Sequence, residues 1–260
     1  MKRNILLMSL ISFSLLFSSC EDDDAIFDGE YTGEYVSEVN WTDVANKSTE
    51  NFSGYFFDPT ERYFVANLAW KLPATIDNSY GYWMQPHALD ILIDAYERTG
   101  DAKYKAFFEP WLEGIKEANK KYYAGGSTGL WNNFYDDMLW CALTTLRLYD
   151  LTGEQVFLDA TETQWGFIKT ADNGLGGGGL AWTVDKPYSR MACSSGPGCL
   201  FASKLYKTYK RIGRDADAAE SLDFAIRTYG WMTTFLCDVS TGQVYDNLSL
   251  EVDGSYSEDP

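Results

Sequence analysis

Hydrophobic side chains recur at helical spacing from Trp41 onward. In two long stretches they lie three and four residues apart: Tyr104, Phe108, Trp111 and Ile115 in one, and Ala218, Leu222, Ala225, Tyr229, Met232 and Leu236 in the other. This spacing puts the apolar groups on one face of a helix, so each stretch predicts an amphipathic helix with one buried and one solvent-facing side. No convincing run shows the alternation that is typical of β-strands.

Other segments are apolar on almost every side. The clearest runs from Met138 to Tyr149, and the segments 87–96 and 199–209 are similar. A helix that is apolar all round is buried on most sides. Buried helices that alternate with one-sided helices predict a double-layered ring, in which outer helices surround inner ones. A flat solenoid of similar hairpins is the alternative.

An internal repeat supports this organisation. The segment Tyr96-Glu-Arg-Thr-Gly-Asp101 recurs at residues 149–154 and, more loosely, at 209–214. Its glycine is expected in the left-handed position that ends a helix, and the acidic or polar residue after it is expected to start the next one. The glycines concerned are Gly100, Gly153 and Gly213. A repeat of this size with helix–turn–helix content indicates stacked helical hairpins.

The pattern predicts about seven helices, at residues 42–57, 87–99, 102–121, 136–152, 155–171, 198–212 and 215–236. A closed ring of six hairpins needs twelve. We therefore expect an all-α fold in which the ring is incomplete and about five helices are missing after Pro260. The flanks of the first and last helices would then be apolar and exposed.

The first residues have the features of an export signal. Lys2 and Arg3 precede an apolar run from Ile5 to Phe17, and two serines then lead to Cys20. This order predicts a lipoprotein signal peptide at residues 1–19 and a lipidated Cys20. A plain signal peptide is the alternative, whereas a membrane-spanning anchor would need about 18 to 20 apolar residues.

Residues 20–40 are expected to form an acidic tether, which begins with Glu21-Asp-Asp-Asp24. An acidic run after the lipidated cysteine resembles the surface-export tag of lipoproteins in some Gram-negative bacteria, and a solvated spacer is the simpler alternative. We expect an outer-membrane lipoprotein on the cell surface, with the periplasmic face as the second possibility. The catalytic domain is expected at residues 41–260.

The amino-acid composition indicates which kinds of molecule the chain binds. The formal net charge is −17, which excludes nucleic acid as a natural ligand because phosphate binding needs clustered Lys and Arg. Nine Trp and eighteen Tyr favour a neutral sugar polymer, since sugar rings stack on aromatic faces. A single histidine, His87, and, besides Cys20, four cysteines without a CxxC pair argue against a zinc site, and no metal or cofactor is expected.

The cysteines have simpler roles in this interpretation. Cys193 and Cys199 are the only close pair, and export would permit a disulfide between them. Cys141 lies in an apolar helix and is expected to be a small buried side chain. His87 is expected to be a core group, because a lone histidine is more often that than a catalyst.

Asp136 and Asp137 are the strongest candidates for chemistry. They open the most apolar helix, directly after Trp131-Asn-Asn-Phe-Tyr135. A single aspartate at that place is most simply a helix cap. A pair at the start of an inner helix points instead toward the centre of the ring. Glycoside hydrolysis uses two carboxyl groups, and adjacent residues suit the retaining geometry of about 5 to 5.5 Å. Their proximity should also separate their pKa values.

The glycine-rich stretch 174–179 is followed by Leu180-Ala-Trp182. It lacks the Lys-Ser/Thr of a phosphate-binding loop. We interpret it as a loop with close backbone approach that lines a groove together with Trp182, and a plain linker is the alternative.

Several motifs together resemble glycoside hydrolase family 76, the α-1,6-mannanases, over residues 41–250. The first motif is Tyr135-Asp-Asp-Met-Leu-Trp140, which runs on to Arg147-Leu-Tyr-Asp-Leu-Thr-Gly153. The second is Gly176-Gly-Gly-Gly-Leu-Ala-Trp182. The third is Ala192-Cys-Ser-Ser-Gly-Pro-Gly198, followed by Ala202-Ser-Lys-Leu-Tyr206, and the last is Thr241-Gly-Gln-Val-Tyr-Asp246. The resemblance implies an (α/α)6 barrel that hydrolyses α-1,6-mannosidic linkages with retention and without a metal. Family members continue with several more helices after the last motif, so the chain looks truncated.

The resemblance also implies roles for individual residues. Asp136 would be the nucleophile and Asp137 the general acid/base. The sugar subsites would be lined by Trp131, Asn132, Tyr135 and Trp182. Ser195 departs from the family pattern, which has Asn before Gly-Pro.

We therefore expect a monomeric hydrolase acting on α-mannan. A non-catalytic surface glycan-binding lipoprotein is the main alternative. A third possibility is another enzyme on the same helical ring, such as a lyase or an unsaturated-uronyl hydrolase. Its acidic substrate would favour a basic cleft, whereas this chain is acidic. A helical scaffold for protein partners would leave the aspartate pair unexplained.

Overall fold

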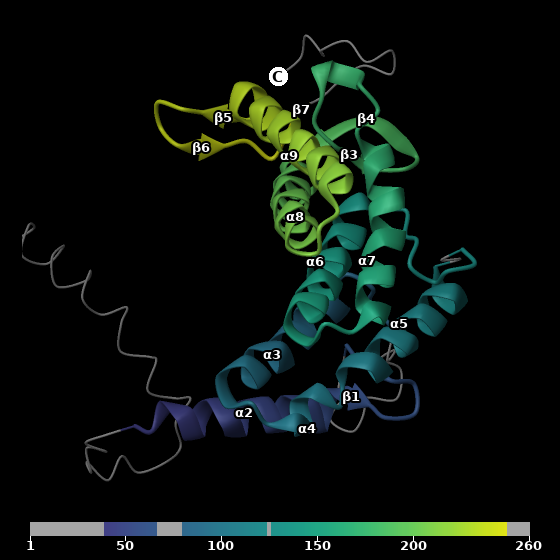
Figure 1. Cartoon of the computed structure of the whole chain (residues 1–260), viewed down its shortest axis with the longest axis vertical. Helices are drawn as coiled ribbons and strands as arrows, with labels where there is room; N and C mark the ends of the chain where they lie inside the picture. Colours follow the sequence, from purple (N-terminus) through teal and green to yellow (C-terminus); the bar gives the residue numbers. More distant parts are fainter. Residues whose placement is uncertain (1–38, 67–79, 124–125, 249–260) are drawn as a thin grey trace, which may run out of the picture. The chain divides into compact units, whose positions relative to one another are not determined.

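The computed structural model describes residues 39–66, 80–123 and 126–248 (Figure 1). The chain divides into two units, residues 1–41 and 42–260, and the account below concerns the second. The expected signal peptide, the lipidation site Cys20 and nearly all of the acidic tether lie outside the described residues. No helix in the described part is both long and apolar enough to cross a bilayer.

Eight α-helices form most of the described chain. They are α2 (Trp41–Phe56), α3 (Met84–Thr99), α4 (Ala102–Lys105), α5 (Phe108–Tyr122), α6 (Tyr135–Thr152), α7 (Gln155–Ile168), α8 (Ala192–Arg211) and α9 (Asp215–Phe235). They confirm the predicted all-α class. The short 3-10 helices η2 (Lys169–Ala171) and η3 (Leu175–Gly177) lie between α7 and the first strand of a small sheet.

The repeated glycine ends a helix as predicted. Gly100, Gly153 and Gly213 have φ angles of 67°, 72° and 78°, in the left-handed region that glycine adopts without strain. The amide of Gly100 donates to the Tyr96 carbonyl at 2.8 Å. After it, Asp101 caps α4 by accepting from the Lys103 amide at 2.9 Å. The other two copies start their next helices without a side-chain cap.

The two largest differences from the predicted helices both involve a proline. The predicted helix 102–121 is broken between α4 and α5, since Pro110 has no N–H for the Ala106 carbonyl and its ring crowds that carbonyl. The predicted helix 198–212 instead starts at Ala192 and continues through Pro197. There the packing of buried Ser195 and Pro197 outweighs the lost backbone hydrogen bond.

The helices form two layers. The apolar helices α3, α6 and α8 are neighbours in that order, and α7 and α9 cover α6 and α8 from the other side (Figure 1). Trp165 of α7 fixes this arrangement, because its ring meets Phe201 of α8 at 5.7 Å and Phe224 of α9 at 4.8 Å. The buried core is continuous from α3 to α9, as the ring of hairpins predicts.

Short strands, which the sequence pattern did not predict, connect the helices. Hairpins are formed by β1 (Phe57–Asp58) with β2 (Tyr63–Phe64) and by β5 (Cys237–Asp238) with β6 (Gln243–Val244). A three-stranded antiparallel sheet has the order β3 (Ala181–Thr183), β4 (Lys186–Met191) and β7 (Asn247–Leu248). With two to six residues each, these strands are too short to show alternation.

The three-stranded sheet joins the start of α6 to the start of α8. Thr183 forms a β-bridge with Phe134, and the amide of Val184 donates to the Asn133 carbonyl at 2.9 Å. At the other end, β4 runs directly into α8. The sheet therefore brings β3 and the first turn of α8 to the residues that open α6.

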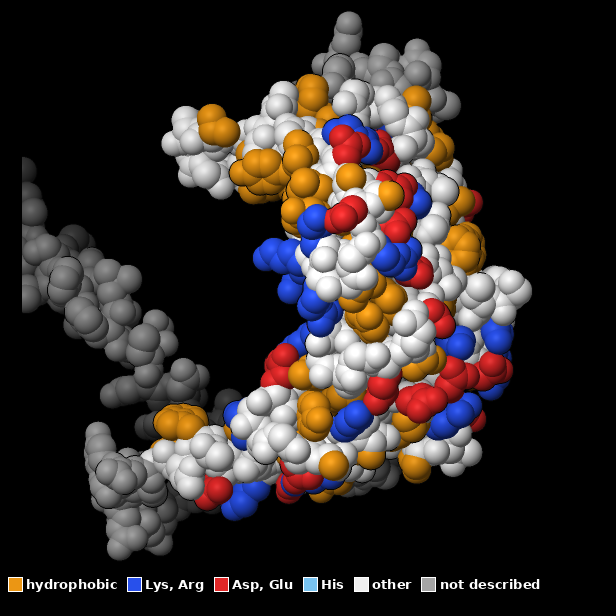
Figure 2. Space-filling model, in the orientation of Figure 1, with side chains coloured by type: hydrophobic (Ala, Val, Ile, Leu, Met, Phe, Trp, Pro, Cys, Tyr) orange, Lys and Arg blue, Asp and Glu red, His pale blue; other side chains and the backbone are white. Residues whose placement is uncertain are grey.

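The outer face of α9 is apolar and exposed, as the sequence predicted for the last helix. On α9, Leu222, Ile226 and Tyr229 are 36%, 61% and 62% exposed, and hydrophobic side chains gather over this helix and the β5–β6 hairpin (Figure 2). The predicted stripe on α9 was partly wrong, because Leu222 and Tyr229 are not buried. The buried face instead uses Ala218, Ala225 and the larger Phe224.

Candidate active site

The first turn of α6 presents the aspartate pair. Phe134 is the N-cap and has extended backbone angles, so Asp136 and Asp137 lie inside the helix rather than at its cap. Asn132 prepares this start, because its Oδ1 accepts the Phe134 amide at 2.8 Å. Both carboxyl groups are half-buried and face the positive end of the helix dipole.

The two carboxyl groups experience different surroundings. Burial raises the pKa of Asp136, while hydrogen bonds from its own amide, the Cys193 thiol, the Asp137 amide and the Trp182 side chain oppose that rise. Burial and the charge of Asp136 raise the pKa of Asp137 to about 7, with no such donors to oppose it. Asp136 is thus equipped to ionise first and Asp137 to keep its proton near neutral pH.

Trp182 reaches this site from β3. Its half-buried ring packs edge-on against Phe134 at a centroid distance of 5.3 Å. The β-bridge between Phe134 and Thr183 sets this distance, because it fixes β3 beside the N-cap of α6. The structure therefore brings Asp136, Asp137 and Trp182 together.

The other three candidate residues lie in the same segment but mostly point into the protein. Asn132 is 1% exposed and Tyr135 is 5% exposed, and the Tyr135 hydroxyl pairs with the Thr170 hydroxyl at 2.9 Å. Trp131 is half-buried against the core, and its carbonyl accepts from the Asn119 side chain at 2.6 Å. These contacts fix the course of the chain into α6.

Three buried polar atoms near these segments have no hydrogen-bond partner: Oδ1 of Asp136, Nδ2 of Asn132 and Oγ of Ser194. Buried polar atoms are normally paired, so an unpaired set around a proposed reaction centre suits a bound ligand or water. Ser194 lies in the first turn of α8, next to Cys193.

Sequence reasoning missed two features of this region. Cys193 influences the pKa of Asp136 although 57 positions separate them, and nothing local to either residue indicates it. At the surface, Asn133 donates to Asp185 of the β3–β4 turn at 2.9 Å. The segment Ala192–Gly198 was singled out as a motif, and that was the available signal for Cys193.

The remaining singled-out residues have structural surroundings. His87 is exposed rather than part of the core, and its ring lies 5.0 Å from that of Trp140, because it faces the open side of α3. Cys141 is fully buried, as predicted. Cys193 and Cys199 are free thiols on one helix, so the disulfide is not formed. Ser195 is buried and accepts the Leu180 amide at 3.0 Å.

The glycine-rich loop packs against α9 rather than lining a groove with Trp182. A Cβ on Gly179 would lie 2.5 Å from the Trp231 ring, and the Trp231 indole donates to the Gly176 carbonyl at 2.9 Å. Fully buried Arg190 supports the loop from the other side by donating to the Ala171 and Leu175 carbonyls and to Asn173. The close backbone approach was predicted, but its partner was not.

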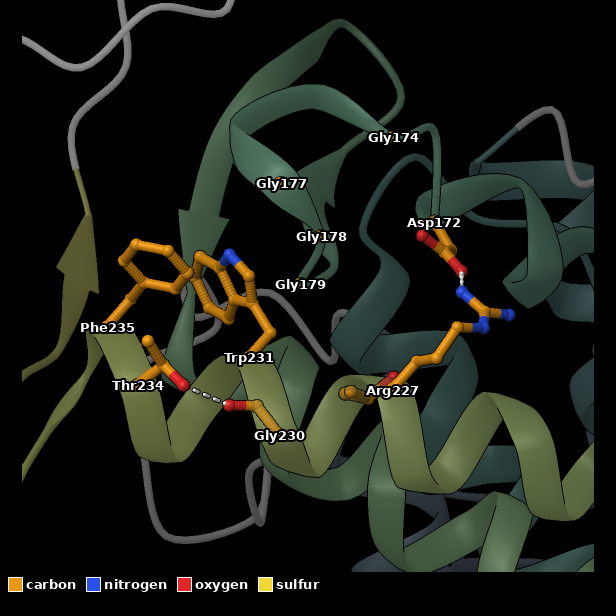
Figure 3. A pocket seen from close by; sticks show the side chains of 11 residues that line it. Asp172, Gly174, Gly177, Gly178, Gly179, Arg227, Gly230, Trp231, Thr234 and Phe235 are labelled. Atoms are coloured by element: carbon orange, nitrogen blue, oxygen red, sulfur yellow. Dashed lines mark hydrogen bonds and ion pairs between the residues drawn. The ribbon is translucent and has the colours of Figure 1, made fainter.

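A cavity of about 450 Å³ lies between this loop and the end of α9 (Figure 3). Trp231 and Phe235 form one wall, and the ion pair of Arg227 with Asp172 closes one end. None of the six candidate site residues lines it, so the cavity and the aspartate pair are separate features. Elsewhere in the described chain, no cluster of His, Cys, Asp and Glu could hold a metal ion.

Comparison with known proteins identifies relatives. Residues 40–258 match the family model of glycosyl hydrolase family 76. The GH76A α-1,6-mannanase from Salegentibacter sp. HEL1_6 is 32% identical over 85% of this chain and 60% of its own, with a TM-score of 0.71. An inactive variant of that enzyme, with two consecutive aspartates changed to alanine, was solved with α-1,6-mannotetrose and matches with 32% identity over 84% and 58% of the two chains, with a TM-score of 0.71.

A more distant structure supports the fold alone. The family 76 mannosidase Bt3792 from Bacteroides thetaiotaomicron is 24% identical over 81% of this chain and 58% of its own, with a TM-score of 0.66. These relatives are (α/α)6 barrels, which confirms the predicted ring. This chain spans 58% to 60% of their length. No curated protein matches it.

Proposed function

This chain belongs to glycosyl hydrolase family 76, and from that premise we propose that it contributes the catalytic pair of a retaining hydrolase that cleaves α-1,6-mannosidic linkages in α-mannan. The observation that supports this most directly is the aspartate pair at the start of α6. Burial raises the pKa of both carboxyl groups, and the charge of Asp136 helps to bring that of Asp137 to about 7.

The chemistry follows from this difference. Asp136, ionised, attacks the anomeric carbon, while Asp137, still protonated, gives its proton to the leaving glycosidic oxygen. A glycosyl ester on Asp136 results. Asp137, now ionised, takes a proton from water, and that water displaces Asp136 from the sugar with overall retention. Adjacent side chains in one helical turn suit the short carboxyl separation of this mechanism.

Aromatic faces would hold the polymer. We expect Trp182 and Trp131 to contact sugar rings, because both are half-buried, Trp182 against the N-cap residue of α6 and Trp131 three positions before that residue. Asn132 and Tyr135 are buried, so in this proposal Asn132 acts through its unpaired Nδ2 and Tyr135 mainly holds the first turn of α6. A relative's complex with α-1,6-mannotetrose supports the substrate class.

The test uses purified residues 21–260 with linear α-1,6-mannan, and chromatography follows the released sugars. We expect short manno-oligosaccharides from the wild type and none from D136N or D137N. Proton NMR of early products should show the α-anomer first, whereas the β-anomer would exclude retention. A folded wild-type chain that releases nothing, with circular dichroism confirming its helices, would contradict the proposal.

A surface glycan-binding role is the second candidate. It is favoured by the exposed apolar face of α9. In that case the chain would retain mannotetraose binding in calorimetry while releasing no sugar from mannan.

For location, we propose a lipoprotein anchored in the outer membrane through Cys20 and exposed at the cell surface. The basic, apolar and cysteine-ending order of the first residues supports this. Metabolic labelling with an alkyne palmitate analogue should mark the wild type and not C20A. Protease added to intact cells should remove the protein if it faces outward and spare it if it faces the periplasm.

A further inference from the structure

The cavity between the glycine-rich loop and α9 has the dimensions of a small-ligand site. Its volume of about 450 Å³ lies within the range of roughly 300 to 1,000 Å³ that such sites span. Loop glycines between positions 174 and 179 form one side, and the end of α9, from Arg227 to Phe235, forms the other (Figure 3). A Cβ on Gly230 would meet nothing within 4 Å. A ligand in the cavity can therefore approach the backbone on both sides.

The wall on α9 is aromatic. The rings of Trp231 and Phe235 have centroids 5.6 Å apart and planes tilted by 35°. Trp231 is buried under the loop, and its hydrogen bond to the Gly176 carbonyl holds the indole in place. Phe235 is 39% exposed and offers its ring to a ligand. The apolar faces of sugar rings pack on such side chains.

Polar groups meet at the other end of the cavity. Nη1 of Arg227 pairs with Oδ2 of Asp172, and Nε of Arg227 donates to Asp223 at 2.8 Å. Oδ1 of Asp172 can therefore accept a hydrogen bond from a ligand, and Nη2 of Arg227 can donate one. An acceptor beside a donor suits two neighbouring hydroxyl groups of a sugar ring.

The balance of charge indicates an uncharged ligand. Among the described residues that line the cavity, Asp172 and Arg227 are the only charged ones, and they form an ion pair. Because Arg227 also pairs with Asp223, an anionic ligand would meet a positive charge that is already compensated. An apolar ligand would bury the Asp172 carboxylate and the peptide groups of the glycines without giving them partners. A neutral, hydroxyl-rich molecule meets both conditions.

We propose that this cavity is a carbohydrate-binding site, separate from the aspartate pair on α6, which holds an uncharged sugar chain between Phe235 and the Asp172–Arg227 pair. The choice of α-1,6-mannan as that chain rests on the proposed function. A polymer held at two places on one protein dissociates more slowly than one held at a single place. The cavity would therefore retain long substrate and take no part in bond cleavage.

Glycine-selective ¹⁵N NMR tests the site directly. The probe is α-1,6-mannotetraose, added to residues 21–260 carrying D137N so that the ligand is not cut. The Gly230 amide signal, assigned from its absence in G230A, should shift until the site is saturated. Gly54 of α2, assigned in the same way from G54A, should not respond. A Gly230 signal that stays fixed up to about 10 mM would overturn the proposal, since so weak a site could not retain the polymer.

An acidic sugar chain tests the charge argument. Tetragalacturonate should leave the Gly230 signal fixed under the same conditions. A larger shift with this probe than with mannotetraose would contradict a site for uncharged sugars.

Blocking the cavity gives a second measurement. G230L adds a side chain at a position where a Cβ meets nothing within 4 Å, and G54L makes the same change in α2, where a Cβ is equally unopposed. In gels that contain linear α-1,6-mannan, G230L in the D137N background should be retarded several-fold less than its parent, as should F235A. G54L should be retarded like the parent. With circular dichroism showing intact helices, equal retardation of all four proteins would overturn the proposal.

Cleavage assays separate this inference from the proposed function. With Asp137 intact, G230L should raise KM for long mannan several-fold and leave kcat/KM on α-1,6-mannotriose unchanged. Cleavage of mannan by the wild type combined with a silent Gly230 signal would overturn the cavity site alone. No cleavage by the folded wild type combined with a saturable Gly230 shift would overturn the proposed function and retain the sugar site.

Discussion

The ring of Trp182 meets the ring of Phe134 edge-on at 5.3 Å, which places an aromatic face from β3 beside the N-cap of the helix that bears both aspartates. The same indole opposes the rise that burial causes in the pKa of Asp136. One side chain thereby links the sheet to the start of α6, and in the proposed function its ring is the face on which a sugar would stack.

Replacing this side chain should separate its two roles. In W182A both the aromatic face and the donor are lost, and we expect kcat/KM on manno-oligosaccharides to fall about thirtyfold, on the order of 2 kcal/mol. W182F keeps a ring without an N–H, and its loss should be several times smaller. Equal losses in the two variants would mean that the donor, not the ring, is what matters.

Activity should decline in mildly alkaline solution. Asp137 must be protonated to act as the general acid, and its pKa is about 7. At a pH below this pKa, Asp137 carries its proton and can act as the acid. At a pH above it, kcat/KM should fall about tenfold for each pH unit. Rates measured between pH 5 and pH 9 would locate this limb. A rate that is flat to pH 9 would exclude Asp137 as the acid.

Asp137 also makes the stability of the folded chain depend on pH. Its pKa is raised from 3.8 to about 7 on folding, so the folded state binds more protons than the unfolded state between those values, and stability falls as pH rises through that window. D137N removes the ionisable group. At pH 8 we expect it to be more stable than wild type by on the order of 1 to 3 kcal/mol, because partial exposure softens the burial penalty.

Urea unfolding at pH 4 and pH 8 would measure this. The two proteins should differ little at pH 4 and diverge at pH 8. D159N, on the exposed surface of α7, serves as a control for the charge change and should not reproduce the effect. Parallel curves for wild type and D137N would contradict the raised pKa.

Two glycines of one loop offer a matched test of packing. Gly179 and Gly174 both have positive φ angles, 70° and 76°. A Cβ on Gly179 would collide with the Trp231 ring, whereas nothing lies within 4 Å of one on Gly174. G174A should therefore cost only the backbone strain, about 1 kcal/mol, and G179A about 2 kcal/mol more. Thermal unfolding would compare them, and equal losses would show that backbone strain alone governs this loop.

Local signals explain what the sequence could predict. The glycine that ends each helix and the spacing of apolar residues both act within a few positions, so Gly100, Gly153 and Gly213 located three hairpin turns correctly. The aspartate pair was visible for the same reason, because its two members are adjacent and open the same helix.

The approach of the first turn of α8 to the residues that open α6 has no such local signal. It depends on a sheet whose strands are two to six residues long, and on the pairing of β4 with β7 across more than fifty residues. The burial of Asn132 and Tyr135 also follows from tertiary packing around α6, since both are polar or amphipathic side chains that the family resemblance placed in the sugar subsites.

The two faces of α9 show the limit of periodicity and provide a last test. Apolar residues occupy both sides of this helix, so spacing alone could not decide which side is buried. Phe224 is 3% exposed against Trp165, and Ile226 is 61% exposed. F224A should cost about 3 to 5 kcal/mol, because it empties a packed position, while I226A should change stability by less than about 0.5 kcal/mol. Urea unfolding of both variants would check this. A large loss in I226A would mean that its face of α9 is covered in solution.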